Sequence, residues 1–208
     1  MKRQKIIIST LVLNLFLMGN LFAQTPQFDR LKENFEQNRI FEADFSHLYK
    51  DAFTGEEQYS EGKIWIGKER YRIEGDLQTM VVDGEVSTVY DQSRNRVIIS
   101  DYIEEEDDFA PSRMLQGVDE SFEVSERSLQ NGSAEITLTS DDPFTVFNTV
   151  TIFLNGEGNP EEIVAVDQAE NELVTTFKNG NFTEESKDLF RVEVPADAEL
   201  IDMRYDSE

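Results

Sequence analysis

The chain lacks several residue types on which common protein functions depend. It has 208 residues with no cysteine, one histidine, and 19 lysines and arginines against 43 acidic residues. Without cysteine, a disulfide framework, a thiolate metal site and a cysteine nucleophile are excluded, and a single histidine excludes metal motifs that need two. The formal net charge of −24 disfavours a nucleic-acid partner, because that binding depends on lysine and arginine. With 38% hydrophobic residues the chain can still form a sizeable core.

The N-terminus has the pattern of a secretory signal peptide. Three basic residues precede an apolar run over residues 6–18, and we expect cleavage after Ala23. Because Leu21 is larger than the residue usual at its place, an uncleaved N-terminal anchor is the alternative. Cleavage leaves 16 basic against 43 acidic residues, a net charge of −27. We therefore expect an exported, soluble periplasmic protein with residues 24–208 as a single domain.

Most of the remaining chain alternates polar and apolar residues with the period of a β-strand. In residues 41–49 the odd positions face one way, as in a half-buried strand. Similar runs follow at Gln58–Ile66, Arg70–Glu74, Thr79–Val82, Ser87–Asp91, Arg96–Ser100, Phe122–Leu129, Ala134–Thr139, Thr149–Leu154, Ile163–Val166 and Glu172–Lys178. Four dipeptides typical of hairpin turns occur at Asp83-Gly84, Asn131-Gly132, Asn155-Gly156 and Asn179-Gly180. The sequence therefore predicts a mainly β fold, an antiparallel sheet of about eleven strands.

Two segments carry helical signals instead. Pro26 stands near the start of the first, and its apolar residues Phe28, Leu31 and Phe35 share one face. The second lies within Asp101–Gly117, where Asp108 can cap a short helix, Pro111 suits its first turn and Gly117 its end.

A curled sheet of this size leaves a broad apolar face, and the two helices are small covers for it. One interpretation is that the helices complete an ordinary packed core. The other is a partly open barrel whose interior holds an apolar ligand. Composition and periodicity alone leave both open.

The order of the motifs adds a resemblance that covers nearly all of residues 24–208. The pieces are Phe41-Glu42-Ala43-Asp44-Phe45, Gly62-Lys63-Ile64-Trp65-Ile66, Tyr71-Arg72-Ile73, Val82-Asp83-Gly84 with Tyr90-Asp91, Pro111 with Met114-Leu115, Phe190 to Pro195, and Leu200-Ile201-Asp202. In this order, behind an export signal, they resemble the outer-membrane lipoprotein carrier family, LolA. The resemblance implies an incomplete antiparallel β-barrel covered by an N-terminal helix and a short mid-chain lid helix.

The resemblance also implies a function. Such carriers shelter the acyl chains of lipoproteins in an apolar cavity, receive them from the inner-membrane ABC transporter LolCDE and pass them to an outer-membrane acceptor such as LolB. Tyr71 and Ile73 match cavity positions of the family. Strand alternation extends this predicted acyl-chain site to Met80, Val82, Val89 and Ile98, and the predicted lid residues are Phe109, Met114 and Leu115. Each of these could equally belong to an ordinary core.

The family's Arg-Pro after the tryptophan-bearing strand, linked to lid closure, is replaced here by Gly67-Lys68-Glu69-Arg70. Lys68 or Arg70 could supply the cation, although lysine lacks the planar donor fork of arginine. We expect a monomer.

The sequence contains few residues that would support other classes of function. His47 has no nucleophile motif near it, and Gly-x-Ser-x-Gly is absent, so we expect no enzyme, no cofactor and no metal site. The acidic run Glu104 to Asp108 is interpreted as a solvated loop. Two alternatives to a lipoprotein carrier remain. One is a related periplasmic module that binds free acyl lipids or senses envelope stress, and the other is an adhesion or interaction domain with a filled core.

Overall fold

The computed structural model describes residues 25–104, 107, 109–119 and 121–205. The predicted signal peptide, and Asp108 with much of the acidic run, lie outside these residues. The elements are α1 (Pro26–Glu36), β1 (Arg39–Lys50), β2 (Glu57–Ile66), β3 (Tyr71–Gly75), β4 (Gln78–Val82), β5 (Val86–Asp91), β6 (Arg96–Asp101), α2 (Pro111–Gln116), β7 (Glu123–Ser128), η2 (Gln130–Gly132), β8 (Ala134–Thr139), β9 (Phe147–Leu154), β10 (Pro160–Asp167), β11 (Glu172–Glu184) and β12 (Glu199–Asp202).

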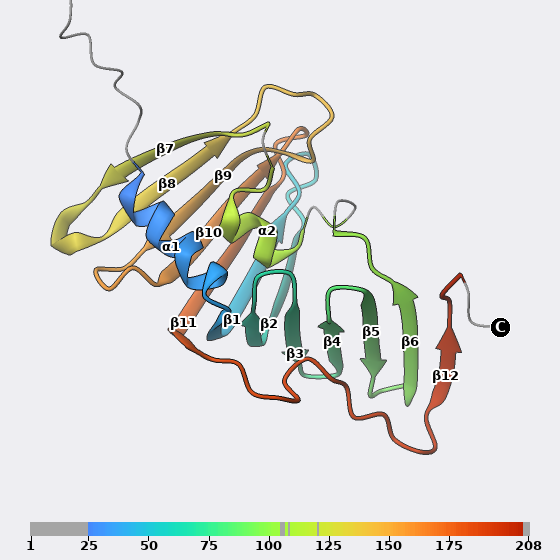
Figure 1. The fold of residues 1–208 in the computed structure, drawn as a ribbon. Coiled ribbons are helices and arrows are strands. Elements are labelled where there is room, and N and C mark those ends of the chain that lie inside the picture. The colour runs from blue at the N-terminus through green and yellow to red at the C-terminus, as the bar shows by residue number, and fades with distance from the viewer. Residues whose placement is uncertain (1–24, 105–106, 108, 120, 206–208) are drawn as a thin grey trace, which may run out of the picture.

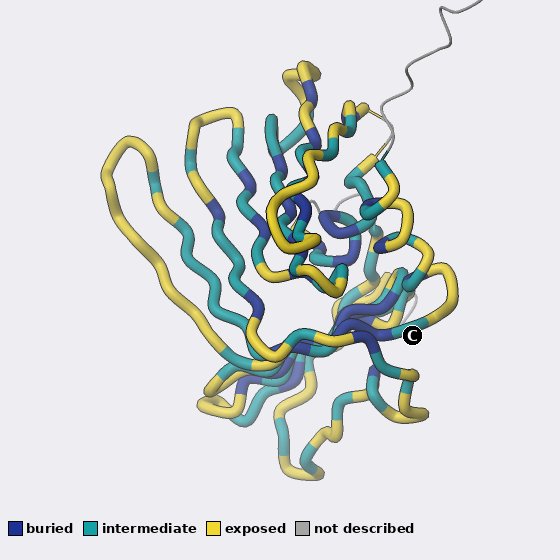
Figure 2. Tube along the Cα trace, turned by 90° about the vertical axis from the view of Figure 1, so that its left-hand side faces the viewer, coloured by how far each residue is buried: buried dark blue, intermediate teal, exposed yellow. Residues whose placement is uncertain are grey.

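Within the described residues the strands form one open sheet that curls around the helices (Figures 1 and 2). The strand order is β12-β6-β5-β4-β3-β2-β1-β11-β10-β9-β8-β7, with β7 and β12 at the two edges. All neighbours are antiparallel except β12, which pairs parallel with β6. The expected incomplete barrel covered by two helices is therefore confirmed. The sheet has twelve strands where about eleven were predicted, because the short β12 was missed.

Three of the four predicted turns connect neighbouring strands. Asp83-Gly84 joins β4 to β5, Asn131-Gly132 lies between β7 and β8, and Asn155-Gly156 joins β9 to β10. The prediction for Asn179-Gly180 was wrong, since both residues lie inside β11. Asn179 has φ of +57°, and the pairing of β11 with β1 shifts by one residue there. The dipeptide therefore forms a β-bulge, which needs the same left-handed backbone as a turn.

Helix α1 buries the face that the sequence predicted and receives its N-terminal cap from a distant strand. Phe28, Leu31 and Phe35 are at most 2% exposed. The local cap residue Thr25 makes no side-chain cap bond. Instead, Glu126 of β7 accepts hydrogen bonds from the backbone N–H groups of Gln27 and Phe28, both at 3.0 Å. A carboxylate at this end also complements the helix dipole.

Replacing Glu126 with alanine should therefore lower the free energy of unfolding by about 1–2 kcal/mol. Two first-turn amides would lose their protein acceptor, as after loss of an N-cap. Urea denaturation of the mature chain measures the change. Glu123→Ala on the same strand is the control, since Glu123 is exposed, and an equal loss in both variants would contradict the capping role.

Helix α2 is the predicted mid-chain helix. It starts at Pro111 and ends at Gly117, whose φ of +116° is the left-handed conformation of a helix stop. The N-cap position is Ala110, which makes no side-chain cap bond, so the residue at the cap is not the predicted Asp108. Met114 and Leu115 face inward and are at most 3% exposed.

The main core lies where both helices meet the sheet, as the buried residues in Figure 2 show. It is formed by buried side chains of α1, α2, β1, β2 and β8–β11, among them Phe28, Leu31, Phe35, Phe41, Ile64, Ile66, Leu115, Ile136, Leu138, Ile152, Leu154 and Ile163. Burial of this apolar surface is the dominant stabilising contribution to the fold.

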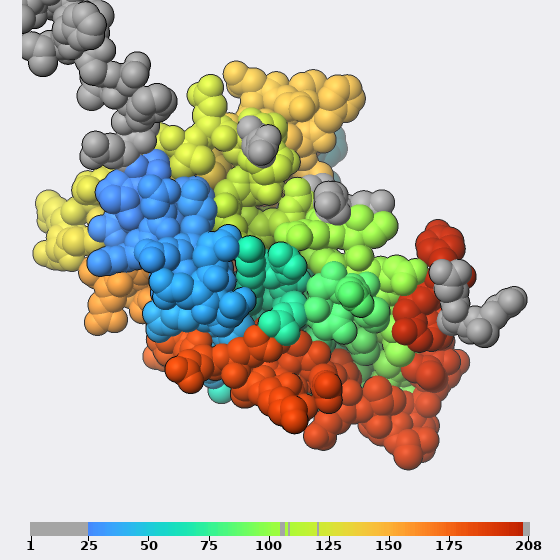
Figure 3. Space-filling model, in the orientation of Figure 1, coloured from blue at the N-terminus to red at the C-terminus, as the bar shows by residue number. Residues whose placement is uncertain are grey.

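The opposite face of the sheet is covered by the chain between β11 and β12, which runs along its lower side (Figures 1 and 3). Phe190 of this segment is buried against Ile40 and Val81 in a second, smaller cluster. Arg70 holds the segment through an ion pair with Glu185 at 2.6 Å. The sheet thus has one face for the helices and one for the C-terminal segment.

Candidate functional site

A row of apolar side chains crosses half of the sheet on the face that the helices cover. Its members are paired directly across neighbouring strands, so they point to the same side. From β2 to β12 they are Ile64, Ile73, Met80, Val89, Ile98 and Ile201, called here the apolar row. Ile64 is buried in the main core, while the other five are partly exposed. The apolar row therefore runs out of the core onto an open part of the sheet, and four of the six predicted acyl-chain residues belong to it.

The other two predicted residues, Tyr71 and Val82, face the same side but are covered. They pair with each other across β3 and β4 and form a buried cluster with Ala110, just before α2. The Tyr71 hydroxyl donates a hydrogen bond to Asp107 at 2.7 Å. Burial, and then this bond, raise the pKa of Tyr71, so the phenol stays protonated and remains a donor. The segment before α2 is thus bound to the sheet beside the apolar row.

The predicted lid residues divide into two environments. Met114 and Leu115 pack into the main core with α1. Phe109 is 57% exposed, and its ring meets Phe147 edge-on with 5.2 Å between ring centroids. Helix α2 therefore inserts two side chains into the core, while Phe109 stays at the surface. That any of these residues contacts an acyl chain stays a prediction.

Helix α2 is attached to the turn between β2 and β3 through the main chain. The Gln116 side-chain amide donates to the Lys68 carbonyl at 2.7 Å. The side chain of Lys68 pairs with Glu36 of α1 at 3.0 Å, and that of Arg70 pairs with Glu185 beyond β11. The Gly67-Lys68-Glu69-Arg70 turn thus holds α1, α2 and the C-terminal segment together. Its contact with α2 comes from the Lys68 backbone, which no sequence motif could have indicated.

A cavity that the sequence did not predict lies on the opposite face. It measures about 930 Å³ and is bounded by the strands β2–β5 and by residues 186–193 of the C-terminal segment. Arg72 spans it by donating to the carbonyls of Leu189 at 3.2 Å and Arg191 at 2.8 Å. The guanidinium also pairs with Glu74 and lies 5.9 Å from the Trp65 ring centroid. The only tryptophan therefore lines this cavity and not the apolar row.

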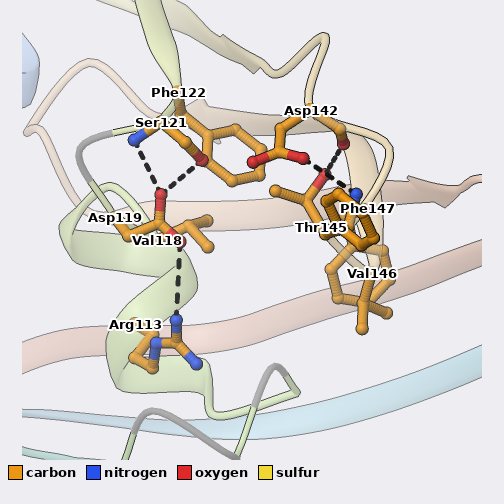
Figure 4. Close-up of a pocket in the computed structure, with 10 residues that line it drawn as sticks. Arg113, Val118, Asp119, Ser121, Phe122, Asp142, Thr145, Val146 and Phe147 are labelled. Atoms are coloured by element: carbon orange, nitrogen blue, oxygen red, sulfur yellow. Dashed lines mark hydrogen bonds and ion pairs between the residues drawn. The ribbon is translucent and has the colours of Figure 1, made fainter.

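A smaller cavity of about 300 Å³ adjoins the C-terminal end of α2 (Figure 4). On one side Arg113 approaches Asp119 at 3.8 Å. A hydrogen bond from Ser121 lowers the pKa of Asp119, so this carboxylate stays charged opposite the arginine. On the other side lie Asp142 and Thr145 of the β8–β9 loop. The C-terminal end of α2 and the β8–β9 loop therefore bound the same cavity.

A third cavity of about 380 Å³ lies between α1 and the β9–β10 turn. None of the three cavities is lined by the six predicted acyl-chain residues. Four of the six lie instead on a partly exposed apolar surface next to a packed core, and Tyr71 and Val82 are buried. The helices fill the interior over one half of the sheet, the segment before α2 covers part of β3 and β4, and the apolar row beyond them stays partly exposed.

The one histidine lies in β1 away from these features. His47 Nδ1 lies 2.9 Å from Thr175 Oγ1 of β11, and burial lowers the pKa of the imidazole. Among the described residues no group of three or more histidine, aspartate or glutamate side chains could hold a metal ion. In the same part of the chain no helix has the length and apolar character needed to span a membrane.

Comparison with known proteins places the fold. No protein-family model and no curated protein matches the sequence. The fold is similar to that of an uncharacterized conserved protein from Thermus thermophilus, with a TM-score of 0.54, 12% identity, and coverage of 85% of this chain and 96% of that one. A LolA superfamily protein from Nitrosomonas europaea aligns with a TM-score of 0.44 and 12% identity over 79% of this chain and 97% of that one.

A third structure, a domain named as an outer membrane lipoprotein-sorting protein from Vibrio parahaemolyticus, aligns with a TM-score of 0.40. The identity is 9%, over 78% of this chain and 94% of that one. Proteins named for the LolA superfamily and for lipoprotein sorting are thus among the structures that this chain resembles. At such low identities the likeness concerns the fold alone.

Proposed function

We propose that the protein is a periplasmic carrier that binds the acyl chains of lipidated proteins along the apolar row and moves them between membranes. The observation that supports the proposal is the apolar row itself. Five aligned and partly exposed apolar side chains cross five strands beside a short lid helix. A continuous apolar surface of this kind is unusual for a face that contacts only water.

The open geometry of the apolar row suits a carrier, which must release its cargo, better than a lipid-storage protein. Burying a chain of about sixteen carbons completely would contribute on the order of 12 kcal/mol, at ~0.8 kcal/mol for each CH₂ group. A surface that covers one side of the chain contributes about half of that. Cargo held on an open row can therefore leave on a useful timescale, whereas cargo in a sealed cavity would be retained.

The remaining parts of the proposal concern partners and charge. The mature chain would receive cargo from an inner-membrane ABC transporter of the LolCDE type and deliver it to LolB or an equivalent acceptor, acting as a monomer without catalysis. A net charge of −27 after signal cleavage keeps such a protein soluble and away from anionic lipid surfaces.

Titration of a fluorescent triacylated lipopeptide tests the proposal, with Val89→Asp as the decisive variant. Val89 lies in the middle of the apolar row, between Met80 and Ile98. Placing a carboxylate against an acyl chain should weaken binding by about 30-fold, since it costs about 2 kcal/mol. Fluorescence anisotropy measures the dissociation constant.

Thr88→Asp is the matched control, because Thr88 precedes Val89 on the same strand and points to the opposite face. It should bind the lipopeptide like the parent chain. Equal affinities for Val89→Asp and the parent chain would exclude the apolar row as the site.

The cargo itself is identified by mass spectrometry of the protein isolated from its native source. A lipidated protein bound to it supports the carrier. Free acyl lipid alone would favour the module that handles free lipids, and a chain without any ligand in both experiments would favour a purely structural domain.

A further inference from the structure

Two phenylalanine side chains stand almost completely in solvent at one end of the sheet. Phe53 is 97% exposed and Phe144 is 92% exposed, while Phe109, the next most exposed phenylalanine among the described residues, reaches 57%. Transfer of such an aromatic ring from water to an apolar environment is favourable. Neither ring packs into the core, so both are available to bury apolar area against a partner.

Both rings are presented by the same local structure. Asp51 Oδ1 accepts hydrogen bonds from the backbone N–H groups of Phe53 at 2.9 Å and Thr54 at 2.7 Å. In the other loop Asp142 Oδ1 accepts from the N–H of Phe144 at 2.9 Å. In each case an aspartate two residues earlier fixes the turn and directs the phenylalanine outward. The two rings therefore stand on ordered turns.

The two turns belong to one end of the molecule. The β1–β2 loop, residues 51–56, is joined to the β10–β11 loop by a bond from Ala52 N–H to Asn171 Oδ1 at 2.9 Å. Gln168 of the β10–β11 loop donates in turn to the carbonyls of Asp142 and Thr145, both at 3.3 Å. Figure 1 shows these loops together at the upper end of the sheet. Through Phe144 and Thr145 this end also lines the cavity at the end of α2.

We propose that this end of the molecule docks transiently on a lipid bilayer by inserting Phe53 and Phe144 into its interface. The area of the two rings favours a bilayer over a protein. Together they can bury about 300–500 Å², whereas a stable protein interface needs about 800 Å² from each partner. The rest of the end offers little apolar area, since the loops around the rings are polar. A bilayer accepts single protruding rings without a complementary pocket.

The charge of the same loops determines which bilayer is bound. Residues 51–56, 140–146 and 168–171 contain five acidic residues and no basic one, namely Asp51, Glu56, Asp141, Asp142 and Glu170. Anionic lipids repel such a surface, and salt screens that repulsion. These three loops therefore bind zwitterionic lipid selectively. Their affinity is low enough for the protein to dissociate again.

Flotation of the mature protein with phosphatidylcholine vesicles tests the inference. The parent chain should float with the vesicles, and Phe53→Ser or Phe144→Ser should each lower the bound fraction about tenfold. Adding phosphatidylglycerol to the vesicles should reduce binding, and raising the salt concentration should restore it. Tyr205→Ser is the matched control, since Tyr205 is also 97% exposed but follows the edge strand β12, away from the three loops.

The inference fails if the parent chain does not float, which would favour a protein partner for this end. It also fails if Tyr205→Ser loses as much binding as Phe53→Ser, or if anionic vesicles bind better than zwitterionic ones. Circular dichroism should show all variants folded, because each changed side chain is at least 92% exposed. Lipopeptide titration of Phe53→Ser should match the parent chain, so this docking and the proposed acyl-chain site are tested independently.

Discussion

Replacing Gly62 with alanine is expected to remove at least about 3 kcal/mol from the free energy of unfolding. A Cβ atom at this position would lie 1.9 Å from the carbonyl oxygen of Glu74 and 2.9 Å from its carbon. Both atoms belong to the backbone of β3, so relief requires β3 to move away from β2. Urea denaturation of the mature chain measures the loss.

Gly75→Ala is the control, because Gly75 is the residue paired with Gly62 across the two strands. A Cβ atom there would meet its nearest atoms at 3.7 and 3.8 Å, ordinary contact distances, and neither glycine has a positive φ. Alanine at Gly75 should change stability by no more than about 0.5–1 kcal/mol and can stabilise, since it restricts the unfolded chain. Similar losses at both glycines would contradict the close approach at Gly62.

The same close approach bears on the proposed function. The Gly62–Gly75 pair lies two residues along from the Ile64–Ile73 pair, where the apolar row leaves the core. If β3 moves away from β2, the row is interrupted at this point. Under conditions where Gly62→Ala is still folded, we therefore expect it to bind the triacylated lipopeptide more weakly than Gly75→Ala does.

Most of the site residues could be assigned to one face of the sheet from strand alternation alone. The side-chain period of a strand is two, so residue parity alone decides which face a side chain occupies. That is why Met80, Val89 and Ile98 could be placed on the same face as Tyr71 before their partners were known. Which of these side chains would be covered could not be predicted. Tyr71 and Val82 are buried by Ala110, and the fold of the segment before α2 over the sheet is a tertiary feature.

The features that were predicted wrongly or missed depend on residues far away in the sequence. Asn179-Gly180 has the local chemistry of a turn, but its conformation serves as a bulge because β1 pairs on both sides of it. The cap of α1 comes from Glu126, about a hundred residues further along the chain, and β12 forms only because β6 offers an edge. Local sequence can indicate a left-handed backbone or a helix start without a cap. Which strand pairs there, or which side chain supplies the cap, depends on the tertiary structure.

Phe41→Ala is the second large prediction, and it concerns this bulge. Phe41 is fully buried, and its ring centroid lies 5.3 Å from that of Phe177 and 5.4 Å from that of Phe182. The ring also covers Gly180, where an added Cβ would lie 2.6 Å from it. Alanine would leave a cavity beside both aromatic rings, and we expect a loss of about 3–5 kcal/mol in the free energy of unfolding.

Phe45→Ala provides the comparison on the same strand and face. Phe45 is only partly buried, so its truncation should cost about half as much, because the surrounding structure and water can fill more of the space. Equal losses for the two variants in urea denaturation would contradict the tighter packing expected around Phe41. A larger loss at Phe41 is the expected result, because its ring packs against Phe177, Phe182 and Gly180.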